Sequence, residues 1–402
     1  MRVSSHPLIR ALRTCGVLAG IILVSTLPAA GQAARSAPTA SADFSGVERF
    51  LEVTAVLETD REPSPDQWDA LFATPGYAVL VQRDFRRDVF MDRFRLAFMP
   101  SRAAALQEQM KRETGFSAQF LPHYLRAKSM RRDIERWMAE ERPETLSEEA
   151  IAKASALLPA GAVSGRPAVS FVIFAPDSRG YDPVVLDLLY CRDQGGRLVD
   201  LVAHEFYHYY RRRLTDWGQD QQTIWVVDQI HNEGVADLID KAGWTRQPDS
   251  ELTGRERDFV KLYRESPNVI RAMDGLLSRM ADMKVGRASL GQELRRAVPQ
   301  SGHPTGLYMA LTILEELGRP ALVATADDPC AFFRLYQEAA AKRGGDTPRF
   351  SPKAMAFLDM IAPRTKSTLS GTTTVRNPAL TSASSKTGNR LRFAALTAST
   401  CA

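Results

Sequence analysis

Apolar residues follow two different periods along this chain. Between residues 45 and 158 they recur every three or four positions, as in Val47, Phe50, Leu51 and Leu57, which is typical of amphipathic helices. The pattern predicts helices over 47–57, 65–72, 85–99, 103–112, 116–138 and 146–158. Residues 168–174 (AVSFVIF) and 183–191 (PVVLDLLYC) are instead continuous runs rich in Val, Leu, Ile and aromatic residues, which predict two strands. The helical period returns at Leu198 and continues to about Ile361, so we expect a predominantly helical α+β fold with a small sheet.

The two ends of the chain lack this periodicity. Arg2, Arg10 and Arg13 precede an uncharged apolar run over 16–27 and then small residues, a pattern typical of a secretory signal peptide. The run is too short to span a bilayer comfortably, so we expect an exported protein, periplasmic or extracellular, with no stable membrane anchor after cleavage. The organisation predicted is a signal peptide over 1–33, a linker over 34–44, one domain over 45–362 with a helical part 45–158 and a strand and helix part 160–362, and a disordered Ser/Thr-rich tail over 363–402.

Charge and cysteine content narrow the functional classes. The ends hold nine basic residues and no acidic ones, so subtracting them from the net charge of +5 leaves −4 for residues 34–362. Lys and Arg are interspersed with Asp and Glu along helical stretches there, which does not indicate a nucleic-acid surface. Export would leave Cys191, Cys330 and Cys401, of which the first two are the pair expected first in a disulfide, although connectivity cannot be derived from sequence.

The segment LVDLVAHEFYHYYRRRL contains an HExxH motif formed by His204, Glu205 and His208. An apolar stripe along the segment predicts a helix, on which the two histidines lie one turn apart on one face and can reach the same zinc ion. Glu205 then stands beside the metal, where a general base can take a proton from water.

The next predicted helix, QTIWVVDQIHNEGVADLIDKAGW, supplies acidic residues that could complete the site. Glu233 is the candidate third ligand across a short turn around 216–220. Asp237, one turn further on, is the candidate hydrogen-bond partner for the second ring nitrogen of a ligand histidine, with Asp240 as the alternative. His231 points away from Glu233 on this helix and is expected to be a core or supporting histidine, and His123 is expected to be structural.

HEFYH followed by NEGVAD resembles the gluzincin clan of zinc metallopeptidases, and the region is also similar to bacterial families of secreted zinc-dependent peptidases. The resemblance implies a zincin-like domain, Zn²⁺ held by His204, His208 and Glu233, Glu205 as general base, and Asp237 as the partner of His204. It also implies that 183–191 forms the edge strand that pairs with an extended peptide or protein substrate.

Gluzincins commonly carry a Tyr or His that donates a hydrogen bond to the developing oxyanion, and no fixed spacing identifies it here. The candidates are His303, just before a helix expected to start at Pro304, and Tyr308, one turn inside that helix. Tyr308 is slightly favoured. The hypothesis is therefore an exported zinc peptidase; a zinc-dependent hydrolase of a non-peptide substrate, or a catalytically silent metal-stabilised binding protein, are the alternatives.

Overall fold

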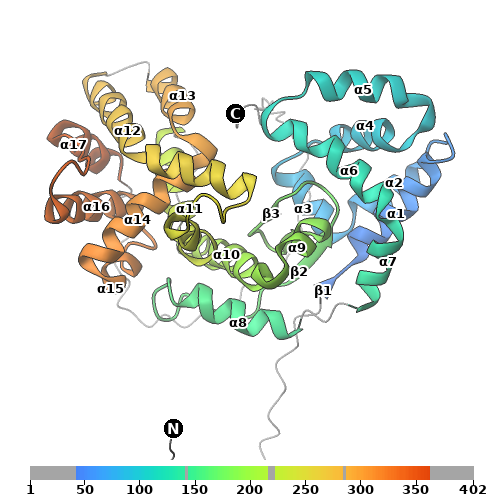
Figure 1. The fold of residues 1–402 in the computed structure, drawn as a ribbon, viewed down its shortest axis with the longest axis horizontal. Coiled ribbons are helices and arrows are strands. Elements are labelled where there is room, and N and C mark those ends of the chain that lie inside the picture. Colours follow the sequence, from blue (N-terminus) through green and yellow to red (C-terminus); the bar gives the residue numbers. More distant parts are fainter. Residues whose placement is uncertain (1–41, 141–143, 216–221, 284–286, 363–402) are drawn as a thin grey trace, which may run out of the picture. The chain divides into compact units, whose positions relative to one another are not determined.

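The protein is described here by a computed structural model that covers residues 42–140, 144–215, 222–283 and 287–362 (Figure 1). The predicted signal peptide, most of the linker, the tail with Cys401 and the turn at 216–220 lie outside these residues. The fold is predominantly helical α+β, as the sequence predicted, with one four-stranded sheet among the described residues.

The first half of the described chain is a series of short helices. Ser64 begins α2 with a capping box: its hydroxyl accepts a hydrogen bond from the Gln67 amide and its own amide donates to the Gln67 side chain. The range 116–138, expected as one helix, is divided at Met130. The helices are α1 (Ser45–Leu57), α2 (Pro65–Phe72), α3 (Pro75–Arg83), α4 (Arg87–Phe98), α5 (Ala103–Arg112), α6 (Phe120–Ser129), α7 (Arg131–Glu140) and α8 (Glu144–Ser155).

The sheet has the order β1-β2-β4-β3 and holds two fully buried strands at its centre. Strands β1 (Ala42–Asp43), β2 (Val169–Val172) and β4 (Val184–Asp187) are parallel, with Val169 opposite Val184, and β3 (Ser178–Arg179) runs antiparallel to β4. Continuous apolar runs suit such central strands, because both faces are covered. Strand β1 lies within the range 34–44 that was expected to be a linker.

Two strand predictions need correction. Residues 183–191 do not form the edge strand: β4 is internal, and the edge beside it is β3, in the segment PDSRGYD that reads as a turn. Residues 188–191 belong to helix α9 (Leu188–Gln194), because the Asp187 carboxylate accepts the Tyr190 amide and caps this helix. The other Asp187 oxygen contacts His123 Nε2 at 2.9 Å and the Phe174 amide at 2.7 Å, which ties α6 to the sheet and gives His123 the expected structural position.

The second half of the chain surrounds two central helices. Helix α10 packs on α8, α9, α11 and β4, and α11 packs most extensively on α14 (Figure 1). The remaining helices are α10 (Leu198–Arg211), α11 (Gln222–Asp240), α12 (Gly254–Asp282), α13 (Arg287–Ala297), α14 (His303–Leu317), α15 (Arg319–Val323), α16 (Pro329–Arg343) and α17 (Pro352–Ile361). Short 3-10 turns cover Pro100–Arg102, Gly115–Gln119, Gly195–Arg197, Ala242–Arg246 and Pro299–Gly302.

Cys330 is a buried free thiol, so the disulfide with Cys191 that was expected first does not form in this structure. Burial raises the pKa of the Cys330 thiol to about 12. Among the described helices, none is both long and apolar enough to cross a membrane.

Candidate metal centre

Helix α10 carries the HExxH motif in a buried position. One helical turn separates His204 from His208, and their Nε2 atoms lie 2.9 Å apart. Glu205 is also buried on this helix. The predicted helical face therefore brings both imidazoles to one point.

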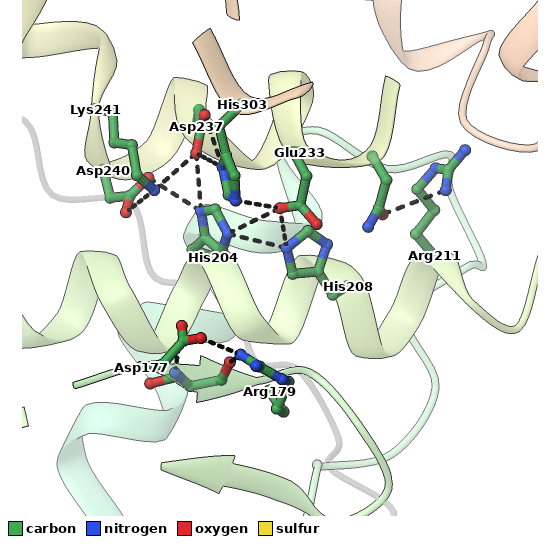
Figure 2. A network of polar contacts seen from close by, with 12 residues as sticks. Asp177, Arg179, His204, His208, Arg211, Glu233, Asp237, Asp240, Lys241 and His303 are labelled. Atoms are coloured by element: carbon green, nitrogen blue, oxygen red, sulfur yellow. Dashed lines mark hydrogen bonds and ion pairs between the residues drawn. The ribbon is translucent and has the colours of Figure 1, made fainter. Parts of the chain in front are cut away.

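Helix α11 completes the cluster. The Glu233 Oε2 atom lies 3.0 Å from His208 Nε2 and 3.6 Å from His204 Nε2. Figure 2 shows Glu233 pointing toward both rings from the facing helix. The sequence prediction that these three residues come together thus matches the geometry, and the three form one of two sets of side chains that could hold a metal ion among the described residues.

His303, the first residue of α14, also reaches this cluster. Its Nε2 atom lies 3.3 Å from Glu233 Oε2, and its ring stacks beside His204 at a centroid distance of 5.9 Å. Helices α11 and α14 approach closely enough for this because glycines face each other: a Cβ atom on Gly234 would lie 2.1 Å from the carbonyl carbon of Gly306.

Two aspartates on α11 orient the histidines, in a different arrangement from the one predicted. His204 Nδ1 lies 3.0 Å from Asp240 and 3.6 Å from Asp237, so the alternative, Asp240, is its hydrogen-bond partner. Asp237 contacts His303 Nδ1 instead, at 3.0 Å, because α14 places His303 directly over it. Lys241 donates to both aspartates at 2.7 Å and holds them in place (Figure 2).

The hydrogen bonds leave an electron-rich centre. A carboxylate can only accept, so the Nδ1 atoms of His204 and His303 carry the protons, and their Nε2 atoms carry lone pairs when the rings are neutral. With neutral rings, only His208, whose Nδ1 atom has no partner among the described residues, could supply a proton to the space between these Nε2 atoms and Glu233 Oε2.

The net charge of the cluster also favours a bound cation. Glu233, Asp237 and Asp240 bring three negative charges and Lys241 one positive charge, which leaves two negative charges to balance when the histidines are neutral, the form in which imidazole binds a metal. A divalent cation balances this deficit, and a set of imidazole nitrogens with one carboxylate oxygen is one that zinc prefers. The residues present therefore fit a zinc ion.

The pKa shifts reflect the same surplus of acceptors. Burial opposes the charged form of His204 and Lys241 adds to this, yet Asp240 and Glu233 raise the pKa of His204 to about 10. Burial would likewise raise the pKa of Glu233, but the neighbouring His208 and His303 hold it well below its usual range. Without a metal, protons on the histidines thus balance the carboxylates, and a bound divalent cation would take the place of these protons.

Glu205 has a separate environment. Its carboxylate makes no hydrogen bond or ion pair with any other residue that the structure describes, and burial raises its pKa. Gly180, between β3 and β4, lies against it: a Cβ atom there would be 2.5 Å from the Glu205 carbonyl oxygen and 3.3 Å from its Oε2 atom. The absence of a side chain at Gly180 lets the strand segment approach the motif helix.

The structure does not bring Tyr308 to the cluster. Its ring neighbours are Tyr263 at 5.8 Å and Tyr336 at 6.5 Å, because five positions along α14 turn its side chain about 140° from His303. Of the two candidates for an oxyanion donor, only His303 therefore lies at the site. His231 is fully buried, stacks on Phe332 and contacts Arg211, in keeping with the supporting position expected for it.

Sequence reasoning did not identify Lys241 or Gly180. Lys241 follows Asp240 directly and lies at i+4 from Asp237, a helical spacing that favours ion pairs and could have identified it. Gly180 offered no comparable signal, because its contact with α10 depends on the position of a strand that forms only by tertiary pairing.

Comparison with known proteins agrees with this chemistry. The model of a family described as "Putative zinc dependent peptidase (DUF5700)" matches residues 68–344, a range that includes α10, α11 and α14. No curated protein and no solved structure gives a significant match. Because the match covers more than half of the chain, this protein belongs to the DUF5700 family.

Proposed function

We propose that this protein is a gluzincin-type zinc peptidase that hydrolyses peptide bonds with His204, His208 and Glu233 as zinc ligands and Glu205 as general base. The observation that carries the proposal is the convergence of His204 Nε2, His208 Nε2 and Glu233 Oε2, with no separation greater than 3.6 Å. Beside them lies the buried Glu205 carboxylate, which has no hydrogen-bond partner in the described part of the chain. Family membership supports the zinc peptidase class.

Each group at the centre has a separate role in peptide hydrolysis. Zinc, when bound, supplies Lewis acidity, which activates water near neutral pH and polarises a carbonyl group. Glu205 accepts a proton from the attacking water at its carboxylate and passes it to the leaving nitrogen. His303 presents Nε2 to the same space, where it can donate a hydrogen bond to the carbonyl oxygen when it carries a proton. Asp237 orients this ring through Nδ1.

The test separates the base from the ligands. Glu205→Gln should retain bound zinc and lose turnover by a factor of at least about 100, because general base catalysis contributes about that much. Glu233→Ala should lose both zinc and activity. Cleavage of a fluorogenic peptide panel and of denatured casein, with zinc measured on the same samples, gives both readings.

A Glu205→Gln variant as active as the parent on a substrate that the parent cleaves would overturn the mechanism. If the parent cleaved ester but not peptide substrates, the protein would be a zinc-dependent hydrolase of another kind and not a peptidase.

We further propose that the protein is exported, on the basis of Arg2, Arg10, Arg13 and the apolar run over 16–27. When the full chain is produced in a bacterial host, the purified extracytoplasmic protein should begin near Ala34 by N-terminal sequencing. A full-length protein confined to the cytoplasm would contradict export without affecting the proposed chemistry.

A further inference from the structure

A polar cavity of about 620 Å³ continues from the metal centre along the C-terminal end of α10. His208 belongs to the cluster and also lines this cavity. The other walls come from the end of α3, from Tyr181 between β3 and β4, and from the facing part of α11. The volume lies in the range of about 300–1,000 Å³ that is usual for ligand sites.

Two guanidinium groups share one aromatic platform in this cavity. The Arg212 guanidinium carbon lies 4.6 Å from the ring centroid of Tyr181, and that of Arg83 lies 5.2 Å from it. Neither guanidinium has a hydrogen bond or ion pair with another side chain in the described part of the chain. Both residues are exposed, so a ligand can reach them.

The acidic residues that line the cavity accept hydrogen bonds from residues other than Arg83 and Arg212. Asp84 accepts hydrogen bonds from Arg179 at 2.7 Å and from the Tyr181 hydroxyl. Asp228 accepts from Arg211 at 2.7 Å. Among the described residues, no carboxylate therefore forms an ion pair with Arg83 or Arg212.

The two cations also act on each other. Part of the Arg212 side chain is exposed, but the protein atoms around its guanidinium desolvate it and lower its pKa. The charge of Arg83 lowers this pKa further, although Tyr181, Glu205 and Asp84 oppose the shift. An anion between the two guanidinium groups would relieve their repulsion. A planar guanidinium binds a carboxylate through two parallel hydrogen bonds, which makes this group the natural counterpart.

We propose that Arg83 and Arg212 form a subsite for a carboxylate group of the substrate, on the His208 side of the metal centre. The inference rests on the proposed function in taking that carboxylate as part of a peptide. The group is either the free C-terminus of a short peptide or the side chain of Asp or Glu, and the experiment below distinguishes the two sources.

The test measures binding, so it does not depend on turnover. The probes are fluorescent octapeptide pools, randomised without acidic residues, that carry either a free C-terminal carboxylate or a C-terminal amide. Two further amidated pools carry Glu or Gln at one central position. Anisotropy titration uses the full exported chain, loaded with zinc and carrying Glu205→Gln so that the peptides stay intact.

At least one carboxylate pool should bind about tenfold more tightly than its neutral match, in line with hydrogen bonds to charged groups. This preference should fall below about twofold when Arg83→Gln and Arg212→Gln are combined, while the neutral pools keep their affinity. A preference for the free C-terminus identifies a C-terminal carboxylate subsite, and a preference for Glu over Gln identifies an acidic side-chain subsite.

Arg213→Gln is the matched control. Arg213 follows Arg212 directly but does not line the cavity, and its guanidinium already donates to the Tyr209 hydroxyl and the Ser164 carbonyl. Equal binding of charged and neutral pools, no binding of any pool, or a preference that survives loss of both arginines would overturn the subsite. If the carboxylate preference depends on the two arginines but the parent protein cleaves no peptide, the proposed function is overturned and the carboxylate site is not.

Discussion

The imidazole of His204 is held from one side by a carboxylate and faces the metal centre with the other. Asp240 accepts the Nδ1 proton and is itself bound by Lys241, so both the tautomer and the orientation of the ring are set. Such outer partners raise the basicity of a ligand histidine and reduce the freedom it loses on binding zinc.

Asp240→Asn should therefore weaken zinc binding by about 10- to 100-fold without abolishing it. Competition with a chromophoric chelator measures the affinity. Asp249→Asn is the control, because Asp249 is an exposed residue that pairs with Arg264. Equal zinc affinity of the Asp240 variant and the parent would show that this hydrogen bond does not support the ligand.

The contacts of a residue could be predicted from sequence only where its partners lie close to it along the chain. His204 and His208 share one helix, so their i,i+4 spacing alone placed both rings together. The partner of Asp237 is His303 on another helix, and no local period encodes that contact. The choice between Asp237 and Asp240 for His204 therefore required the packing of α14.

At the scale of elements, the crossing of α11 and α14 determines whether His303 reaches the site. Ile230, Gly234 and Gly306 form the point of contact, where a Cβ atom on Gly306 would lie 2.0 Å from the Ile230 carbonyl oxygen. Backbone atoms occupy this space, so no side chain can move aside to relieve the overlap.

Gly306→Ala should accordingly destabilise the protein by about 1–3 kcal/mol or more and separate His303 from Glu233. Urea unfolding of the zinc-loaded protein measures the change. Gly275→Ala, in α12 with no atom within 4 Å of the added Cβ, should instead be neutral or up to about 1 kcal/mol more stable. If the two variants had the same stability, the close contact would not be what positions α14.

Elements with strong local signals were predicted well. The range 103–112 matches α5, and the apolar stripe from Leu198 placed α10. Strand β3 could not be predicted, because its two residues become a strand only through pairing with β4. The helix at the end of 183–191 was not predicted. Asp187 is a single polar residue in an apolar run, and the sequence does not show that its carboxylate caps α9.

Across the molecule, the metal centre joins two consecutive helices, α10 and α11, to the more distant α14. Ligand candidates come from α10, α11 and α14, so a bound ion would link them more strongly than packing alone. A ligand that binds only the folded state stabilises it by about 2.7 kcal/mol at 100 times its Kd.

Removal of zinc with a chelator should therefore lower the Tm by about 5–10 °C, since each kcal/mol shifts the Tm of a large domain by about 2–4 °C. Differential scanning calorimetry measures this. The Glu233→Ala variant should have a low Tm that the chelator does not change. An equal drop in that variant would mean that the chelator acts elsewhere on the protein.

The metal centre is tested most directly by the zinc content of the purified protein, measured by elemental mass spectrometry beside His204→Ala. We expect about one zinc per chain in the parent and little or none in the variant, because His204 contributes one of the converging nitrogen atoms. No zinc in either protein after zinc is supplied and the excess removed, or equal zinc in both, would contradict a metal centre at this cluster.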